Sequence, residues 1–144
     1  MKWLLGGATL LIIIAAVALF VIPAKAPTTE PPTPATKDDL IRVDAPLTGT
    51  RVASPLVATG AARGTWYFEA SFPIELRDAG ANVIAEGYAQ AQSDWMTENY
   101  VPFVSIPLVF PPQSAGSTGV LVVRKDNPSG LPEHDNSLQI PVVF

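Results

Sequence analysis

Hydrophobic and polar residues alternate along several short stretches of the chain. In the stretch FPIELR, the side chains of Phe72, Ile74 and Leu76 fall on one face of an extended backbone, and the residues between them fall on the other. Two further rows have the same period of two: Val104, Ile106, Leu108 and Phe110, and Leu138, Ile140, Val142 and Phe144. Pro102 and Pro107 lie near the row that starts at Val104, and Pro107 alternates with its residues. Because a proline has no backbone N–H to donate, these two prolines predict an edge strand or a bulge there.

Runs of this kind, separated by glycine and proline, predict about seven strands in the folded region. They are Ile41 to Asp44, Leu56 to Ala61, Trp66 to Leu76 with a break, Val83 to Gln90, Pro102 to Phe110, Gly119 to Lys125 and Leu138 to Phe144. The apolar run Val120 to Val123 is typical of a strand buried on both faces, and the stretch DAGAN predicts a hairpin turn in which Gly80 and Asn82 accept positive φ angles. No stretch has a sustained helical period. The predicted fold class is therefore all-β, an antiparallel sandwich of two sheets.

The N-terminal segment from Trp3 to Ile22 has a different character, because it holds twenty residues without a charge. At a rise of about 1.5 Å per residue, a helix of this length crosses a hydrocarbon core of about 30 Å. We therefore expect residues 1–22 to be a transmembrane anchor with its short head on the inner side. The alternative is a signal peptide cleaved after the stretch AKA, although the apolar run is longer than that of a typical signal peptide.

The next segment, residues 23–39, contains five prolines and four threonines and has no apolar period. Proline-rich chain is semi-rigid at about 3.1 Å per residue, so this segment can hold a following domain up to about 50 Å from a bilayer. The expected organisation is an anchor at 1–22, a Pro/Thr-rich linker at 23–39 and a β-sandwich domain at 40–144.

Composition removes several classes of function. The chain has no cysteine, so disulfides, thiolate metal sites and cysteine nucleophiles are excluded. Its net charge is −4 with acids and bases scattered, whereas binding to a nucleic-acid backbone needs a basic surface. We therefore expect no nucleic-acid partner.

The stretch KDNPSGLPEHDNS is dense in carboxylates and amides and lies between two apolar runs. Five of its side chains carry the oxygen ligands that calcium prefers: Asp126, Asn127, Glu133, Asp135 and Asn136. Their spacing lacks the alternating carboxylates and central glycine of an EF-hand loop. The Asn-Pro and Ser-Gly pairs favour turns, so we expect a turn-forming loop and no cofactor, with calcium as the alternative.

His134 is the only histidine, so every catalytic triad would depend on it. A triad also needs an exposed serine, and no Gly-x-Ser-x-Gly stretch accompanies this histidine. Between Glu133 and Asp135, His134 is expected to be a solvated loop residue. We expect no catalytic residues and no enzymatic activity.

Aromatic residues gather in the stretch WYFE. Alternation there would place Trp66 and Phe68 on one face and Tyr67 and Glu69 on the other. We expect at least one of these two pairs to lie in the core. Glu69 would then be a carboxylate in an apolar run, and it would need a partner such as Arg63 or Arg124.

A second aromatic segment, QSDWMTENY, has the opposite character, because Trp95 and Tyr100 lie in it among polar residues. Aromatic side chains inside a polar rim are typical anchors of binding surfaces. Trp95 and Tyr100 are therefore the candidate interaction residues.

Three segments together carry a resemblance: SPLVATGAARGTWYFEASFPIELRDAGANVIAEGYAQA, DWMTENYVPF and GVLVVRKDNPSGLPEHDNSLQIPVVF. The features that carry it are Ser54-Pro55-Leu56, Gly60-Ala61, Phe68-Glu69-Ala70, Phe103 and Ile140-Pro141-Val142. Over nearly all of residues 41–144 the chain resembles the immunoglobulin-like domain of bacterial spore germination proteins. The resemblance implies an immunoglobulin-like, extracytoplasmic β-sandwich that is often attached to other envelope modules and has no enzymatic activity.

We therefore expect a module at the cell membrane, held by the segment from Trp3 to Ile22, that binds an envelope protein or a cell-wall polymer. A role in spore germination is one form of this function. The germination proteins carry a companion domain that these 144 residues do not show, which favours a general envelope role. Two alternatives are a cell-wall glycan-binding module that stacks sugars on Trp95 and Tyr100, and an enzyme that depends on His134.

Overall fold

The computed structural model describes residues 31–144, which form eight strands and two short 3-10 helices. The strands are β1 (Ala35–Lys37), β2 (Ile41–Ala45), β3 (Thr59–Arg63), β4 (Ser71–Arg77), β5 (Val83–Ala91), β6 (Tyr100–Ser105), β7 (Thr118–Arg124) and β8 (Ser137–Val143), and the 3-10 helices are η1 (Gly64–Trp66) and η2 (Pro132–His134). None of the helices in this part of the chain is long and apolar enough to span a bilayer. The expected anchor, residues 1–22, lies outside the described residues.

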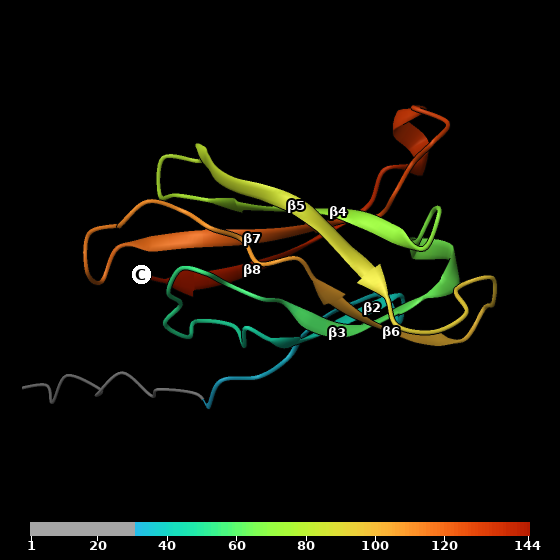
Figure 1. The fold of residues 1–144 in the computed structure, drawn as a ribbon, viewed down its shortest axis with the longest axis horizontal. Coiled ribbons are helices and arrows are strands. Elements are labelled where there is room, and N and C mark those ends of the chain that lie inside the picture. Colours follow the sequence, from blue (N-terminus) through green and yellow to red (C-terminus); the bar gives the residue numbers. More distant parts are fainter. Residues whose placement is uncertain (1–30) are drawn as a thin grey trace, which may run out of the picture.

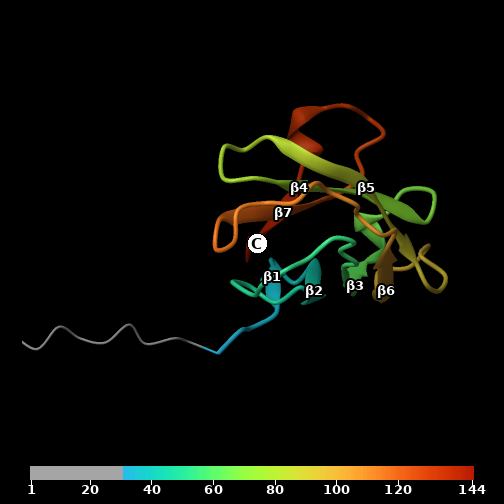
Figure 2. The same ribbon diagram turned by 60° about the vertical axis from the view of Figure 1, so that its left-hand side comes forward.

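All neighbouring strands pair antiparallel, in the order β1-β2-β3-β6-β5-β4-β7-β8. The order divides into two facing layers, one of β1, β2, β3 and β6 and one of β5, β4, β7 and β8 (Figures 1 and 2). β5 and β6 belong to different layers and pair only along residues 89–91 of β5. The all-β antiparallel prediction is confirmed, and the two layers are parts of one hydrogen-bonded sheet that folds over on itself.

The two outer strands of this folded sheet, β1 and β8, meet on its open side. The Nζ of Lys37 on β1 donates to the backbone carbonyl of Ser137 on β8, at 3.0 Å. Further along β8, the N–H of Gly49 donates to the carbonyl of Pro141 at 2.8 Å. β1 is made of residues that the sequence analysis placed in the linker, and all three of them pair with β2. The fold therefore begins before residue 40.

Strands β4 and β8 bury the faces that alternation predicts. Phe72, Ile74 and Leu76 are each at most 1% exposed. Four residues at the C-terminus are buried as predicted: Leu138, Ile140, Val142 and Phe144. The ring of Phe72 lies 5.0 Å from the rings of both Tyr67 and Phe103, measured between centroids, so aromatic contacts join the two layers. Without cystines, the layers are held together by packing of this kind.

The alternating row predicted for β6 is wrong in its first half. Phe103 and Ser105 point into the core, whereas Val104 is 38% exposed. The strand ends at Ser105 and the parity changes before Leu108, which is again buried. Ser105 can be buried because its Oγ accepts a hydrogen bond from the N–H of Ala58 at 2.8 Å. A pattern based on hydropathy assigns such a serine to the wrong face.

Pro102 is in the interior of the sheet rather than on an edge, since β6 lies between β3 and β5. Its carbonyl accepts the N–H of Gln92 at 2.8 Å, just beyond Ala91, the last residue of β5 that pairs with β6. The missing N–H of this proline thus falls at the end of the β5–β6 ladder, where its loss costs little.

The stretch WYFE is broken as expected, but its predicted alternation is wrong. Trp66 ends η1 and Tyr67 follows it directly, and both are buried, while Phe68 and Glu69 are exposed. A 3-10 turn rotates about 120° per residue, so two neighbouring side chains can both face the core. The hydroxyl of Tyr67 donates to the carbonyl of Val101 at 2.7 Å, which satisfies its buried oxygen.

The predicted hairpin turn between β4 and β5 is confirmed, but a different residue accepts the positive φ. Ala81 has a φ of 64°, while Gly80 and Asn82 do not lie in that region. The Oδ1 of Asp78 accepts the N–H groups of Gly80 at 2.8 Å and Asn82 at 2.9 Å. Hydrogen bonds from the side chain and backbone of Asn82 lower the pKa of Asp78, so the turn is closed by a charged carboxylate.

Candidate interaction site at the loop end

Four connecting segments meet at one end of the sandwich, which we call the loop end: residues 38–40, 64–70, 92–99 and 125–136. The last three lie at the right of Figure 1. Backbone hydrogen bonds tie them together, because the N–H of Gly64 donates to Asn99 at 3.2 Å and that of Asp126 donates to Trp66 at 3.0 Å. Segments far apart in sequence therefore form one surface.

Gly64 determines how closely segment 92–99 lies against the sandwich. A Cβ atom at this position would overlap with the carbonyl oxygens of Trp95 and Thr97. With glycine there, Trp95 packs partly against the core, and its neighbour Met96 is left 76% exposed. Trp95, a candidate anchor, is thus half-buried, and the exposed apolar side chain of this segment is Met96.

Tyr100, the other candidate, is held by Arg63 and Asp39. The guanidinium carbon of Arg63 lies 4.1 Å from the centroid of the Tyr100 ring, and the Tyr100 hydroxyl donates to Oδ1 of Asp39 at 2.9 Å. Arg63 in turn donates to Oδ2 of Asp39 at 2.5 Å. Hydrogen bonds from Arg63 and then from Tyr100 lower the pKa of Asp39. The three side chains therefore fix each other's positions, and one face of the Tyr100 ring is covered by a cation.

Exposed aromatic and methionine side chains are concentrated at this end. Among residues 31–144 they are Phe68 at 41%, Tyr88 at 46%, Met96 at 76% and Tyr100 at 36%. All except Tyr88 lie at the loop end, together with Leu131, which is 49% exposed. We call these residues, with the arginine that holds Tyr100, the loop-end surface: Arg63, Phe68, Met96, Tyr100 and Leu131. Phe68 and Met96 were missed by the sequence analysis, although the polar neighbours of Met96 were a signal for it.

The partly buried carboxylate is Glu75 and not Glu69. Glu69 is exposed, whereas Glu75 on β4 forms ion pairs with Arg77 and, at 2.7 Å, with Arg124. Burial on its own would raise the pKa of Glu75, but the hydrogen bonds from Arg124 and Arg77 outweigh it and the pKa is lowered. Arg124 was a correct choice of partner for the wrong carboxylate, while Arg63 pairs with Asp39.

The stretch KDNPSGLPEHDNS forms the loop between β7 and β8, and Asn127 organises it. The Nδ2 of Asn127 donates to the carbonyl of Leu131 at 2.8 Å and to Oδ1 of Asp135 at 2.7 Å. The Oγ of Ser129 donates to the Oδ1 of Asn127 at 2.5 Å, so this amide oxygen is also used within the loop. The turn interpretation matches this geometry, because the side chains hold the loop's own backbone.

The remaining candidate residues of this loop lie apart or face solvent. Glu133 and His134 in η2 are exposed, and the side chain of Asn136 accepts the N–H of Ser137 at 2.9 Å. In the part of the chain that the structure describes, no three histidine, cysteine, aspartate or glutamate side chains are grouped so that they could hold a metal ion. Asp126 is half-buried beside Trp66.

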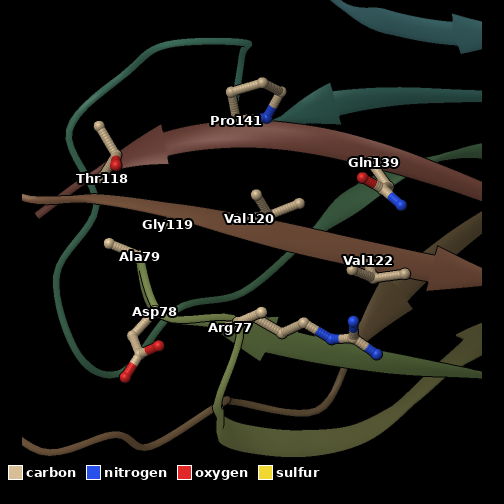
Figure 3. Close-up of a pocket in the computed structure, with 10 residues that line it drawn as sticks. Arg77, Asp78, Ala79, Thr118, Gly119, Val120, Val122, Gln139 and Pro141 are labelled. Carbon is tan, nitrogen blue, oxygen red and sulfur yellow. The ribbon is translucent and has the colours of Figure 1, made fainter.

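A shallow groove of about 340 Å³ crosses the outer face of β4, β7 and β8, away from the loop end (Figure 3). Its floor includes Val122, which is only 3% exposed although it points away from the core, so the prediction that β7 is buried on both faces holds at this residue. Its two charged groups serve the fold, because Arg77 pairs with Glu75 and Asp78 closes the β4–β5 turn. The groove therefore offers an apolar floor, and the charges on its rim are already used by the fold.

A family model agrees with this architecture. The model Gmad2, described as the immunoglobulin-like domain of bacterial spore germination, matches residues 40–131. The match starts at the turn before β2 and ends inside the β7–β8 loop, so β8 lies beyond it. Comparisons with curated proteins and with solved structures find no match. Because the matched segment covers more than half of the chain, the chain belongs to the family of immunoglobulin-like domains of bacterial spore germination.

Proposed function

We propose that this chain is a non-catalytic binding module of the bacterial cell envelope that docks another envelope protein on its loop-end surface. The observation that carries the proposal is the concentration of exposed Phe68, Met96 and Tyr100 at one end of the sandwich. Aromatic, methionine and arginine side chains are the types enriched at protein interfaces. Family membership supports a germination-related role for the binding.

Preorganisation supports the choice of this surface. Tyr100 and Arg63 are held by Asp39, and Arg63 also donates to the carbonyl of Glu98 at 3.4 Å. Ordering a flexible side chain on binding costs about 0.5–1.5 kcal/mol, so side chains that are already fixed bind at a smaller entropic cost. A rigid Arg–Tyr pair beside a flexible methionine combines a fixed anchor with an adaptable contact.

The proposed location of the module rests on the sequence of the segment before it. The uncharged run from Trp3 to Ile22 has the length of a membrane anchor, and the proline-rich linker ends where β1 begins at Ala35. In this proposal the chain is a single-pass membrane protein with its sandwich outside the cytoplasm, and the linker presents the loop end to partners in the envelope.

The direct test is retention of envelope components by the full-length chain, compared with two tyrosine variants. Tyr100→Ala should lower the amount of retained protein at least tenfold, about 1.4 kcal/mol of binding free energy, as expected of an aromatic anchor. Tyr88→Ala is the matched control, because Tyr88 is an exposed tyrosine of β5 away from the loop end, and it should retain the same amount as the wild type.

Treatment of the envelope fraction separates a protein partner from a glycan. Protease treatment before the assay should abolish retention, and digestion of the wall with a muramidase should not. The reverse result would refute a protein partner and favour the glycan-binding alternative. Equal losses for both tyrosine variants would show that the loop-end surface is not the docking site.

A further inference from the structure

A second, polar pocket lies at the base of the β7–β8 loop. Its volume is about 250 Å³, and it is lined by Lys37, Arg124, Lys125, Asp135, Asn136 and Ser137. These residues come from the end of β1, the end of β7 and the segment that leads into β8. The described residues contain seven lysines and arginines, and three of them line this pocket.

The cations of this pocket have donors to spare. An ammonium group carries three N–H donors, and Lys37 uses one of them, on the carbonyl of Ser137 at 3.0 Å. Within residues 31–144 no ion pair involves either Lys37 or Lys125, and Arg124 pairs through a single nitrogen with Glu75. Lys125 is half-buried, and its backbone N–H is fixed to the carbonyl of Asn136 at 2.8 Å.

The acceptors of the pocket are largely in use. Asp135 is its one carboxylate, and the Oδ1 of Asp135 already accepts from Asn127 at 2.7 Å. The Oδ1 of Asn136 accepts the N–H of Ser137 at 2.9 Å. Three cations and one carboxylate leave a local charge of +2 in a chain whose net charge is −4. A donor-rich, acceptor-poor cavity of this sign is complementary to an anion.

We propose that this pocket binds a phosphate group, either as free phosphate or as a phosphodiester. A phosphate presents several strong acceptor oxygens around one centre, which suits donors that arrive from three elements of the fold. A carboxylate is planar and has two oxygens, so it offers fewer acceptor directions than a phosphate to donors that arrive from three elements. This inference is independent of the protein that docks on the loop-end surface.

The two sources of phosphate chemistry in an envelope are free phosphate and the phosphodiesters of lipid headgroups and anionic polymers. Lys37 is the last residue of β1, so the first strand of the described fold supplies one wall of the pocket. Inorganic phosphate and glycerophosphoglycerol, a soluble phosphodiester, are the two probes that separate these sources.

The test is titration of the full-length chain with each probe at constant ionic strength, followed by isothermal calorimetry and thermal unfolding. The expected result is saturable binding of at least one probe and a rise in the unfolding midpoint. Lys125→Gln should weaken binding at least tenfold, and Lys37→Gln provides a second variant should the first fail to fold. Arg51→Gln is the control, because it also removes one positive charge but Arg51 does not line the pocket. Arg51 donates instead to the carbonyl of Phe144 at 2.6 Å, and the variant should bind each probe as the wild type does.

The relative affinities of the probes assign the source. Tighter binding of the phosphodiester supports a lipid or polymer ligand, and tighter binding of inorganic phosphate supports the free ion. Absence of saturable binding of both probes, an equal response to acetate, or equal weakening in Arg51→Gln would overturn the proposal.

Discussion

The backbone strain of the turn between β4 and β5 is concentrated at Ala81. Its φ of 64° lies in the left-handed region, which costs a residue with a Cβ about 1–2 kcal/mol. Glycine relieves that cost, but it also increases the conformational entropy of the unfolded chain, which lowers the free energy of unfolding by about 0.4–1 kcal/mol. Ala81→Gly should therefore stabilise the chain by about 0.5 kcal/mol in urea unfolding. The matched control is Ala79→Gly, in the same turn but without a positive φ, which should destabilise it.

Glu75 provides a test by pH. Its pKa is lower in the folded chain than in the unfolded chain, so its stabilising effect is complete above the unfolded value near 4.5 and is lost as the pH falls through the folded pKa. Glu75→Gln should cost about 1 kcal/mol at pH 7, and the difference from the wild type should shrink below pH 4.5. Urea midpoints measured across this range check the prediction. Glu133→Gln, at an exposed glutamate of η2 that takes part in none of the ion pairs of residues 31–144, is the matched control and should change stability by less than about 0.5 kcal/mol at pH 7. A constant difference between Glu75→Gln and the wild type across this pH range would contradict the role of the ion pairs.

Single residues are also where sequence reasoning was weakest. Alternation identified the buried face of β4 but chose Glu69 as the partly buried carboxylate, because η1 interrupts the strand before it. It likewise placed Val104 inside and Ser105 outside, since the hydrogen bond that pairs Ser105 with Ala58 joins residues 47 positions apart. Long-range hydrogen bonds of this kind leave no mark on local periodicity.

At the level of elements, the position of segment 92–99 depends on one glycine, Gly64, which begins η1 directly after β3. Gly64→Ala would place a Cβ against the carbonyls of Trp95 and Thr97, so the segment must move and Trp95 must leave its contact with the core. We expect a loss of about 1–3 kcal/mol in unfolding free energy and a red shift of tryptophan emission. Thr65→Ala, at the exposed next residue, should change stability by less than about 0.5 kcal/mol. Unchanged emission in Gly64→Ala would contradict this packing.

Seven of the eight strands could be predicted as elements, because each has alternating or continuous apolar residues between turn signals. The exception is β1, whose three residues Ala-Thr-Lys have no periodicity. It forms because β2 offers an unpaired edge and because Lys37 reaches β8. Such a strand depends on its neighbours rather than on its own residues.

At the scale of the whole molecule, the strand order follows from tertiary packing and not from any single stretch. β3 pairs with β6 and β4 pairs with β7, so strands far apart in sequence become neighbours and the loop end gathers four separate segments. Trp95 and Tyr100 could be picked out as candidates by their polar neighbours. The contacts of Tyr100 with Arg63 and Asp39 depended on the fold, because they join β6 to β3 and to the turn before β2.

Docking on the loop-end surface can be measured directly by photocrosslinking in living cells from two positions with similar exposure. A photoreactive residue in place of Met96, which is 76% exposed at the loop end, is compared with one in place of Val109, which is 73% exposed and lies outside it. We predict that position 96 yields an adduct with an envelope protein, that Tyr100→Ala abolishes this adduct, and that position 109 yields none. Equal adducts from both positions, or an adduct at position 96 that survives Tyr100→Ala, would contradict docking on the loop-end surface.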